Sequence, residues 1–282
     1  MKSMHKITLA CGAAALVLPA AGQAQERDGD RYFDGVYISG VIGTESAADG
    51  KEDGLVFDTD RDGTFNDTVL TGAEADAFSP GFCAGDALSP ERSCRGNRAG
   101  EGYAVRVGYD RHLGSGPIVA GILVEGAKPS VEEFTSGFST TPASYTFGRE
   151  LDWTVTGRAR IGIAPGEGRA LLYATGGAGF ARIERSFATS NGANAFTPSD
   201  ANDWKFGWQA GGGAEVMLTR NIGLGLEYLY SRYNDGDYTV AVGPGTAPET
   251  NPFLLESGGT DIRLSNDKFD FHALRASVNL RF

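Results

Sequence analysis

The stretch from Lys268 to Phe282 constrains the fold of this 282-residue chain more than any other segment. Every second residue of its last part is apolar and belongs to one parity, namely Leu274, Ala276, Val278, Leu280 and Phe282. The other parity is polar and contains Arg275, Ser277, Asn279 and Arg281. A period of two predicts a β-strand with one apolar and one polar face. Such a strand needs a partner for each edge, and closing the sheet into a barrel supplies both partners.

Composition narrows the environment of these strands. The 41 glycines are about twice the usual share. Many lie inside alternating segments, as in residues 176–179 and 211–213, where they suit strands that bend or pack closely. The net charge of −11 disfavours nucleic acid as a partner. After residue 25 no apolar run reaches the roughly 20 residues that a spanning helix needs, so a membrane form of this chain would cross with strands.

Residues 1–24 are typical of a secretory signal peptide that is removed on export. Lysines precede an apolar stretch over residues 7–18, and small residues stand before position 25. Cleavage there leaves residues 25–282 as one domain. Export also places Cys83 and Cys94 in an oxidising compartment, where we expect them to form a loop disulfide.

Seven further segments repeat the alternation of the last strand. With it, the eight expected strands span residues 36–43, 103–110, 118–125, 151–163, 170–183, 204–218, 224–231 and 268–282. In the fourth strand we expect Leu151 and Trp153 on the same apolar face. Long connections alternate with short turns rich in Gly, Pro and Asn. The longest connection, residues 44–100, shows no apolar period and is expected to be one long loop.

This alternation predicts an all-β fold, an eight-stranded antiparallel up-and-down transmembrane β-barrel with long extracellular loops and short periplasmic turns. The first strand is expected to pair with the last and close the barrel. Aromatic side chains fall near the ends of the apolar faces, where an interfacial girdle is expected. They are Tyr103, Tyr109, Trp153, Trp204, Trp208, Tyr228 and Tyr230.

Over about residues 32–282 the chain resembles the small, porin-like outer-membrane β-barrel proteins, relatives of the transmembrane barrel of outer-membrane protein A. The resemblance is carried by GWQAGGGAEV at 207–216, LEYLY at 226–230 and the alternating residues 274–282. It implies the outer membrane of a Gram-negative bacterium as location. It also implies outer-membrane lipid, the barrel insertion machinery and periplasmic chaperones as partners. The apolar parity from Leu274 to Phe282 looks like the signal that the insertion machinery reads.

Charged residues on the polar parities are expected inside the barrel. They are Arg106, Glu125, Arg158, Arg160, Glu215, Glu227 and Arg275. Charges in such an interior must be paired or hydrated, and eight strands enclose a space just wide enough for side chains to fill. We therefore favour a salt-bridge plug, with a narrow or gated channel as the alternative. Arg275 is expected to meet Glu215 or Glu227.

The long loop contains the first half of a calcium-binding pattern at residues 58–69. Alternate oxygen-bearing side chains before and after a sharp turn at Gly63 can converge on one calcium ion. The predicted ligands are Asp58, Asp60, Asp62, Thr64 and Asn66. Position twelve, normally a glutamate, is Val69, so a solvated acidic loop is the alternative.

Two other function classes fit less well. Catalysis would have to use His272 near Asp267 and Asp270, with Ser231 or Ser265 as nucleophile, but no spacing singles these residues out, and we expect no enzyme. A soluble lipocalin-like binder needs the opposite parity, polar outside and apolar inside. We expect an integral outer-membrane protein with a structural or surface-interaction role and acidic loops outside. The alternative is a small porin-like channel for ions or small solutes.

Overall fold

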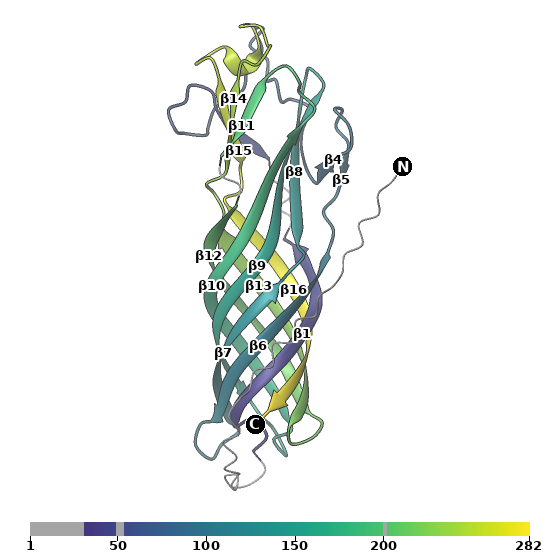
Figure 1. Cartoon of the computed structure of the whole chain (residues 1–282), viewed down its shortest axis with the longest axis vertical. Helices are drawn as coiled ribbons and strands as arrows, with labels where there is room; N and C mark the ends of the chain where they lie inside the picture. Colours follow the sequence, from purple (N-terminus) through teal and green to yellow (C-terminus); the bar gives the residue numbers. More distant parts are fainter. Residues whose placement is uncertain (1–30, 49–53, 200–201) are drawn as a thin grey trace, which may run out of the picture.

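Eight long antiparallel strands close a barrel in the computed structural model, which describes residues 31–48, 54–199 and 202–282 (Figure 1). The strands are β1 (Gly35–Ala47), β6 (Gly100–His112), β7 (Ile118–Lys128), β9 (Ala143–Ile163), β10 (Ala170–Thr189), β12 (Asn202–Met217), β13 (Ile222–Asn234) and β16 (Lys268–Arg281). Each of these eight strands pairs with the one that follows it in this list, so that β10 pairs with both β9 and β12. The last strand, β16, pairs with the first, β1. The predicted barrel and its closing seam are therefore confirmed.

The outer wall of the barrel is apolar, as an environment of lipid requires. On β16, the side chains of Leu274, Val278 and Leu280 are exposed on this wall, whereas Arg275 and Arg281 are buried inside. The wall also carries Tyr103, Trp153, Trp204, Phe206, Leu226 and Tyr228. Among the described residues, no helix is long and apolar enough to cross a membrane. The predicted signal peptide lies outside the described residues.

The two ends of the barrel differ. Short connections at residues 113–117, 164–169 and 218–221 lie at one end, beside the carboxyl terminus (Figure 1). At the other end, β9 and β10 continue far beyond the barrel, being 21 and 20 residues long. A transmembrane strand needs only about 9–11 residues. Their outer halves therefore project out of the membrane and support the long connections.

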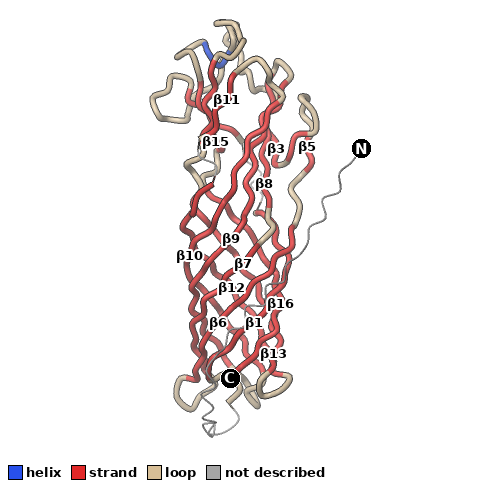
Figure 2. The backbone as a smooth tube through the Cα atoms, in the orientation of Figure 1, coloured by secondary structure: helices blue, strands red, loops and turns tan. Residues whose placement is uncertain are grey.

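These projecting strands carry a second body of β-structure, which we call the outer β-structure (Figure 2). β8 (Glu132–Ser139) pairs with the outer half of β9, and β3 (Gly81–Ala84) pairs with β8. A separate sheet has the order β11 (Ala195–Pro198), β14 (Thr239–Gly243), β15 (Thr260–Leu264), β2 (Leu55–Asp58). β4 (Asp86–Ala87) pairs with β5 (Cys94–Arg95), and η1 (Pro252–Leu254) is a short 3-10 helix.

The prediction of one loop over residues 44–100 was wrong, because its described part contains β2 to β5 and β1 continues to Ala47. Strands of two to four residues are too short to show an alternation. Their partners also lie far away in the sequence, as in the pairing of β2 with β15. The Cys83–Cys94 disulfide is present and links β3 to β5, as predicted.

Leu151 also departs from the prediction. Trp153 pairs with Arg182, but Leu151 pairs with Ile183, so Asp152 is an extra residue on β9. Such a β-bulge shifts the register by one residue and turns the following side chains to the other face. Trp153 therefore faces outward, whereas Leu151 is fully buried inside the barrel.

Candidate functional site

All seven predicted lumen residues belong to two clusters of buried ion pairs inside the barrel. One of the clusters lies farther from the short turns, and we call it the upper ion-pair cluster. It contains Glu45, Arg106, Glu125, Arg158, Glu227 and Arg275. Glu125 is its centre, because Arg106 and Arg158 lie 2.7 and 2.8 Å from Oε2 and Arg275 lies 2.7 Å from Oε1. Three arginines face three glutamates, so the cluster carries no net charge.

The lower ion-pair cluster lies nearer the short turns and contains Asp110, Arg160, Glu215 and Arg281. Arg160 and Arg281 each form salt bridges with both Asp110 and Glu215. The Arg281 guanidinium also lies 4.8 Å from the ring of Phe33, and the Arg160 guanidinium lies 4.6 Å from the ring of Tyr37. Two arginines face two carboxylates, so this cluster is neutral as well.

Arg275 does not contact the predicted partners. Although it pairs in register with Glu227, its guanidinium reaches across the interior to Glu45 and Glu125, both at 2.7 Å. Glu227 instead bonds Arg106 and Arg158, and it accepts a hydrogen bond from the phenol of Tyr173 at 3.0 Å. The long arginine side chain allows pairing with strands that are not its neighbours.

Apolar side chains fill the interior on both sides of the ion pairs. The inner apolar cluster lies toward the long connections and contains Ala47, Val131, Leu151, Ala181, Ile183, Leu229, Tyr233, Phe269, Phe271 and Ala273. The cluster at the other end contains Phe33, Val119, Ala164, Leu171, Tyr173 and Met217. Above the inner apolar cluster, Arg149 bonds Glu133 at 2.7 Å, and Arg185 bonds Asp235. The described side chains thus fill the barrel in successive layers.

Several interior charges were missed by the sequence reasoning. Asp110 and Arg281 lie on the polar parity of predicted strands, so the parity itself could have identified them. Glu45 was missed because the first strand was expected to end at residue 43. Arg149 and Asp235 lie in segments expected to be loops, where no parity signals burial.

The predicted calcium ligands are brought together only in part. Carboxylate oxygens of Asp58, Asp60 and Asp67 lie within 4.8 Å of one another. Asp62 is not part of this group and instead accepts a hydrogen bond from the backbone of Thr64 at 2.7 Å. Asp67 thus takes the place expected for Asp62, because the bridge between Phe57 and Asp67 folds the chain back onto β2. Calcium binding stays a prediction.

The residues considered for catalysis are not assembled into a site. His272 is exposed on the outer wall, where Nδ1 lies 2.6 Å from the phenol of Tyr228. Ser231 is buried inside the barrel, on the opposite face of the sheet. Asp270 is bonded by Arg232, and the hydroxyl of Ser265 accepts a hydrogen bond from Gly54.

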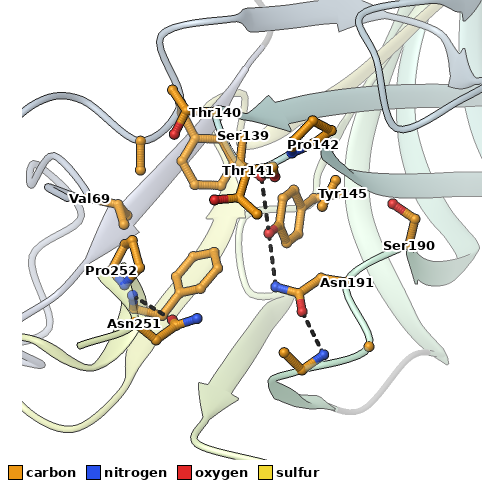
Figure 3. Close-up of a pocket in the computed structure, with 16 residues that line it drawn as sticks. Val69, Ser139, Thr140, Thr141, Pro142, Tyr145, Ser190, Asn191, Asn251 and Pro252 are labelled. Atoms are coloured by element: carbon orange, nitrogen blue, oxygen red, sulfur yellow. Dashed lines mark hydrogen bonds between the residues drawn. The ribbon is translucent and has the colours of Figure 1, made fainter. Parts of the chain in front are cut away.

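An outer pocket of about 260 Å³ lies within the outer β-structure (Figure 3). Segments of all four long connections line it, at Val69 and 77–78, at 139–145, at 190–193 and at 251–253. Its floor is formed in part by the aromatic side chains of Phe78, Tyr145 and Phe253, which are almost fully buried and whose ring centroids lie 5.2 to 5.9 Å apart. These rings belong to the outer core, which also contains Phe57, Phe147, Val240, Val242 and Ile262.

The rim of the outer pocket is polar. It contains Ser139, Thr140, Thr141, Ser190, Asn191 and Asn251. The Asn191 amide donates to the Tyr145 phenol at 3.0 Å, and the hydroxyl of Ser139 lies 3.5 Å from the same oxygen (Figure 3). Burial, opposed by these contacts, raises the pKa of Tyr145, so the phenol keeps its proton at neutral pH. No lining residue in the described part of the chain is charged.

Part of this chain is similar in sequence to known outer-membrane proteins. The 31 kDa outer-membrane immunogenic protein of Brucella melitensis biotype 1 is 30% identical over 182 residues, which is 63% of this chain and 65% of that protein. The match thus spans just under two thirds of the length of that relative, and the protein of the same name in Brucella suis matches equally.

Two matches to solved structures cover most of this chain with little shared sequence. The outer membrane protein OprG from Pseudomonas aeruginosa is 11% identical over 90% of this chain and 100% of that chain, with a TM-score of 0.48. Ail, the attachment invasion locus protein of Yersinia pestis, is 12% identical over 88% of this chain and 99% of that chain, with a TM-score of 0.31. Residues 11–282 match the outer membrane protein beta-barrel domain family. The chain therefore belongs to this family of outer-membrane proteins.

Proposed function

We propose that this protein is a sealed membrane barrel that anchors the outer β-structure for interactions at the cell surface. The observation that carries the proposal is the filled interior. Two neutral ion-pair clusters and two apolar clusters occupy the barrel along its length. A solute would have to separate these groups to pass.

Energetics support a permanent seal. Removing one partner from a buried ion pair costs about 3–5 kcal/mol, because a charge is left without compensation. Glu125 alone holds three arginines, so moving it aside would uncover several charges together. The neutrality of both clusters also leaves no excess charge inside to attract an ion.

The outer β-structure supports a role in surface interaction. All four long connections contribute to one core and one pocket, and a disulfide links two of the strands. Such a body offers a fixed surface, which loses little conformational entropy when it binds a partner. The name of the Brucella relatives, an immunogenic outer-membrane protein, is in keeping with exposure at the cell surface. We propose no catalytic role.

Solute flux into liposomes tests this proposal. The full chain, refolded into liposomes, is expected to admit neither potassium ions nor small sugars above the rate of empty liposomes. Liposomes that hold an open general porin provide the positive control. Flux that rises in proportion to the amount of folded protein would contradict a sealed barrel.

We also propose that the lipid-facing residues of β16, together with Phe282 directly after this strand, are read by the barrel insertion machinery, after periplasmic chaperones have delivered the chain. Phe282 is the largest of these side chains and is 61% exposed on the outer wall. Phe282→Ala is expected to slow assembly in cells, with Leu255→Ala, an exposed site in the outer β-structure, as control. Equal assembly rates for both variants and the natural chain would contradict this role.

A further inference from the structure

The charge of the outer pocket restricts what it can bind. The chain has a net charge of −11, yet none of the described residues that line the pocket is charged. A charged ligand would lose its hydration there without gaining an ionic partner, which is unfavourable. The chemistry of the lining therefore selects a neutral ligand.

The distribution of polar groups adds a second restriction. The nearly buried rings of Phe78, Tyr145 and Phe253 form an apolar floor, whereas the hydroxyl-bearing residues Thr140, Thr141 and Ser190 are exposed. The side-chain hydroxyls of Thr140 and Thr141 are exposed and make no hydrogen bond to another residue in the described ranges. A hydroxyl can both donate and accept, so this rim matches a ligand that itself carries hydroxyl groups. A ligand without hydroxyls would displace water from the rim and give nothing in return.

Size adds a third restriction. Pockets for drug-sized ligands have volumes of about 300–1,000 Å³, and the outer pocket, at about 260 Å³, lies just below that range. It accommodates one ring with its substituents. A single pyranose has an apolar face of C–H groups for the apolar floor and an edge of hydroxyls for the rim.

We propose that the outer pocket binds one neutral sugar unit of a glycan, through hydrogen bonds to its hydroxyl rim, with the apolar face of the sugar ring on the pocket floor. This rests on the proposed surface-interaction role and names the class of partner. The lining residues Pro252 and Phe253 belong to η1, which lies at the end of the molecule opposite the short turns, where a glycan outside the cell can reach it (Figure 2). Because segments of all four long connections line it, the pocket exists only when the outer β-structure is folded.

Saturation-transfer NMR on the full chain, in a zwitterionic detergent without a sugar headgroup, tests the proposal. The probes are glucose, galactose and N-acetylglucosamine, with glucuronic acid as the charged probe and p-cresol as the apolar ring. At least one neutral sugar is expected to bind with a Kd on the order of 1 mM. The double variant Thr140→Val with Thr141→Val keeps the side-chain shape and is expected to weaken binding about tenfold.

The matched control is Thr197→Val, which removes an exposed hydroxyl from β11 outside the pocket and is expected to leave binding unchanged. A heat-dependent shift in gel mobility confirms that each variant is folded. Absence of binding by all three neutral sugars would overturn the proposal, and so would equal binding by the double variant and the natural chain. Binding of p-cresol alone would overturn it too. Solute flux is measured on the same samples, so a leaking barrel is distinguished from a barrel that is sealed but does not bind sugar.

Discussion

The barrel interior and the outer core are both filled with buried side chains, but those side chains are mainly charged in the middle of the barrel and mainly apolar in the outer core. Inside the barrel, the middle layers are arginines and carboxylates that are almost fully buried. In the outer β-structure, the buried groups are mainly aromatic and branched apolar side chains, such as Phe78 and Ile262. The difference arises from the surroundings. The barrel wall must be apolar toward lipid, so its polar parity turns inward, whereas water around the outer β-structure drives apolar groups inside.

The change from one chemistry to the other takes place within single strands. On β9, Arg158 and Arg160 face the interior below the bulge at Asp152, and Leu151, Phe147 and Tyr145 are buried beyond it. Trp153, beside the bulge, is 44% exposed on the outer wall, as expected of a residue at the membrane interface. One extra residue thus allows a single continuous strand to turn its polar side chains inward where lipid surrounds it and its apolar side chains inward where water does.

The largest effect is expected from breaking the barrel interior. Glu125→Ala leaves Arg106, Arg158 and Arg275 without their shared carboxylate and is expected to lower the free energy of unfolding by about 3–5 kcal/mol. Urea unfolding in lipid vesicles measures this. The control is Glu101→Ala on β6, an exposed glutamate, with an expected change within about 0.5 kcal/mol. Equal midpoints and slopes for the two variants would mean that the ion pairs contribute little.

Replacing isoleucine by valine is expected to lower the free energy of unfolding by less than Glu125→Ala does, and by different amounts in the two regions. Ile262→Val removes a methylene from a fully buried position of the outer core and is expected to cost about 0.5–1.5 kcal/mol. Ile122→Val acts on a side chain that is 66% exposed to lipid, where no cavity forms, and is expected to cost less than about 0.5 kcal/mol. Unfolding of each variant in the same vesicles gives the comparison. A larger loss of stability for Ile122→Val than for Ile262→Val would contradict the placement of Ile122 on the lipid-facing wall and of Ile262 in the outer core.

How far the sequence predicts the structure depends on the region. In the barrel, alternation with period two gives the strands, their facing and most interior charges, because lipid imposes one rule on every residue of the wall. The rule fails at Leu151, where a bulge changes the parity, and at Glu45, beyond the expected end of the first strand. In the outer β-structure, strands such as β2 and β15 are short and pair over long separations, so no local pattern predicts them or the pocket.

The smallest effect is expected from calcium. Asp58, Asp60 and Asp67 offer one converging carboxylate oxygen each, fewer than the six to eight oxygens that calcium takes, so further oxygens would have to complete the site. Calcium at millimolar concentration is expected to slow protease cleavage within residues 55–70 by a few fold, and Asp67→Asn is expected to abolish this protection. Magnesium serves as the control. Cleavage rates that do not respond to calcium would leave only a solvated acidic loop.

Single-channel recording across a planar bilayer tests the sealed barrel most directly. The natural chain is expected to insert without producing steady conductance steps, because the ion-pair and apolar clusters fill its interior. Reproducible steps from the natural chain would contradict the seal, above all if Arg158→Ala or Glu215→Ala altered their size, because the same side chains would then line a conducting path.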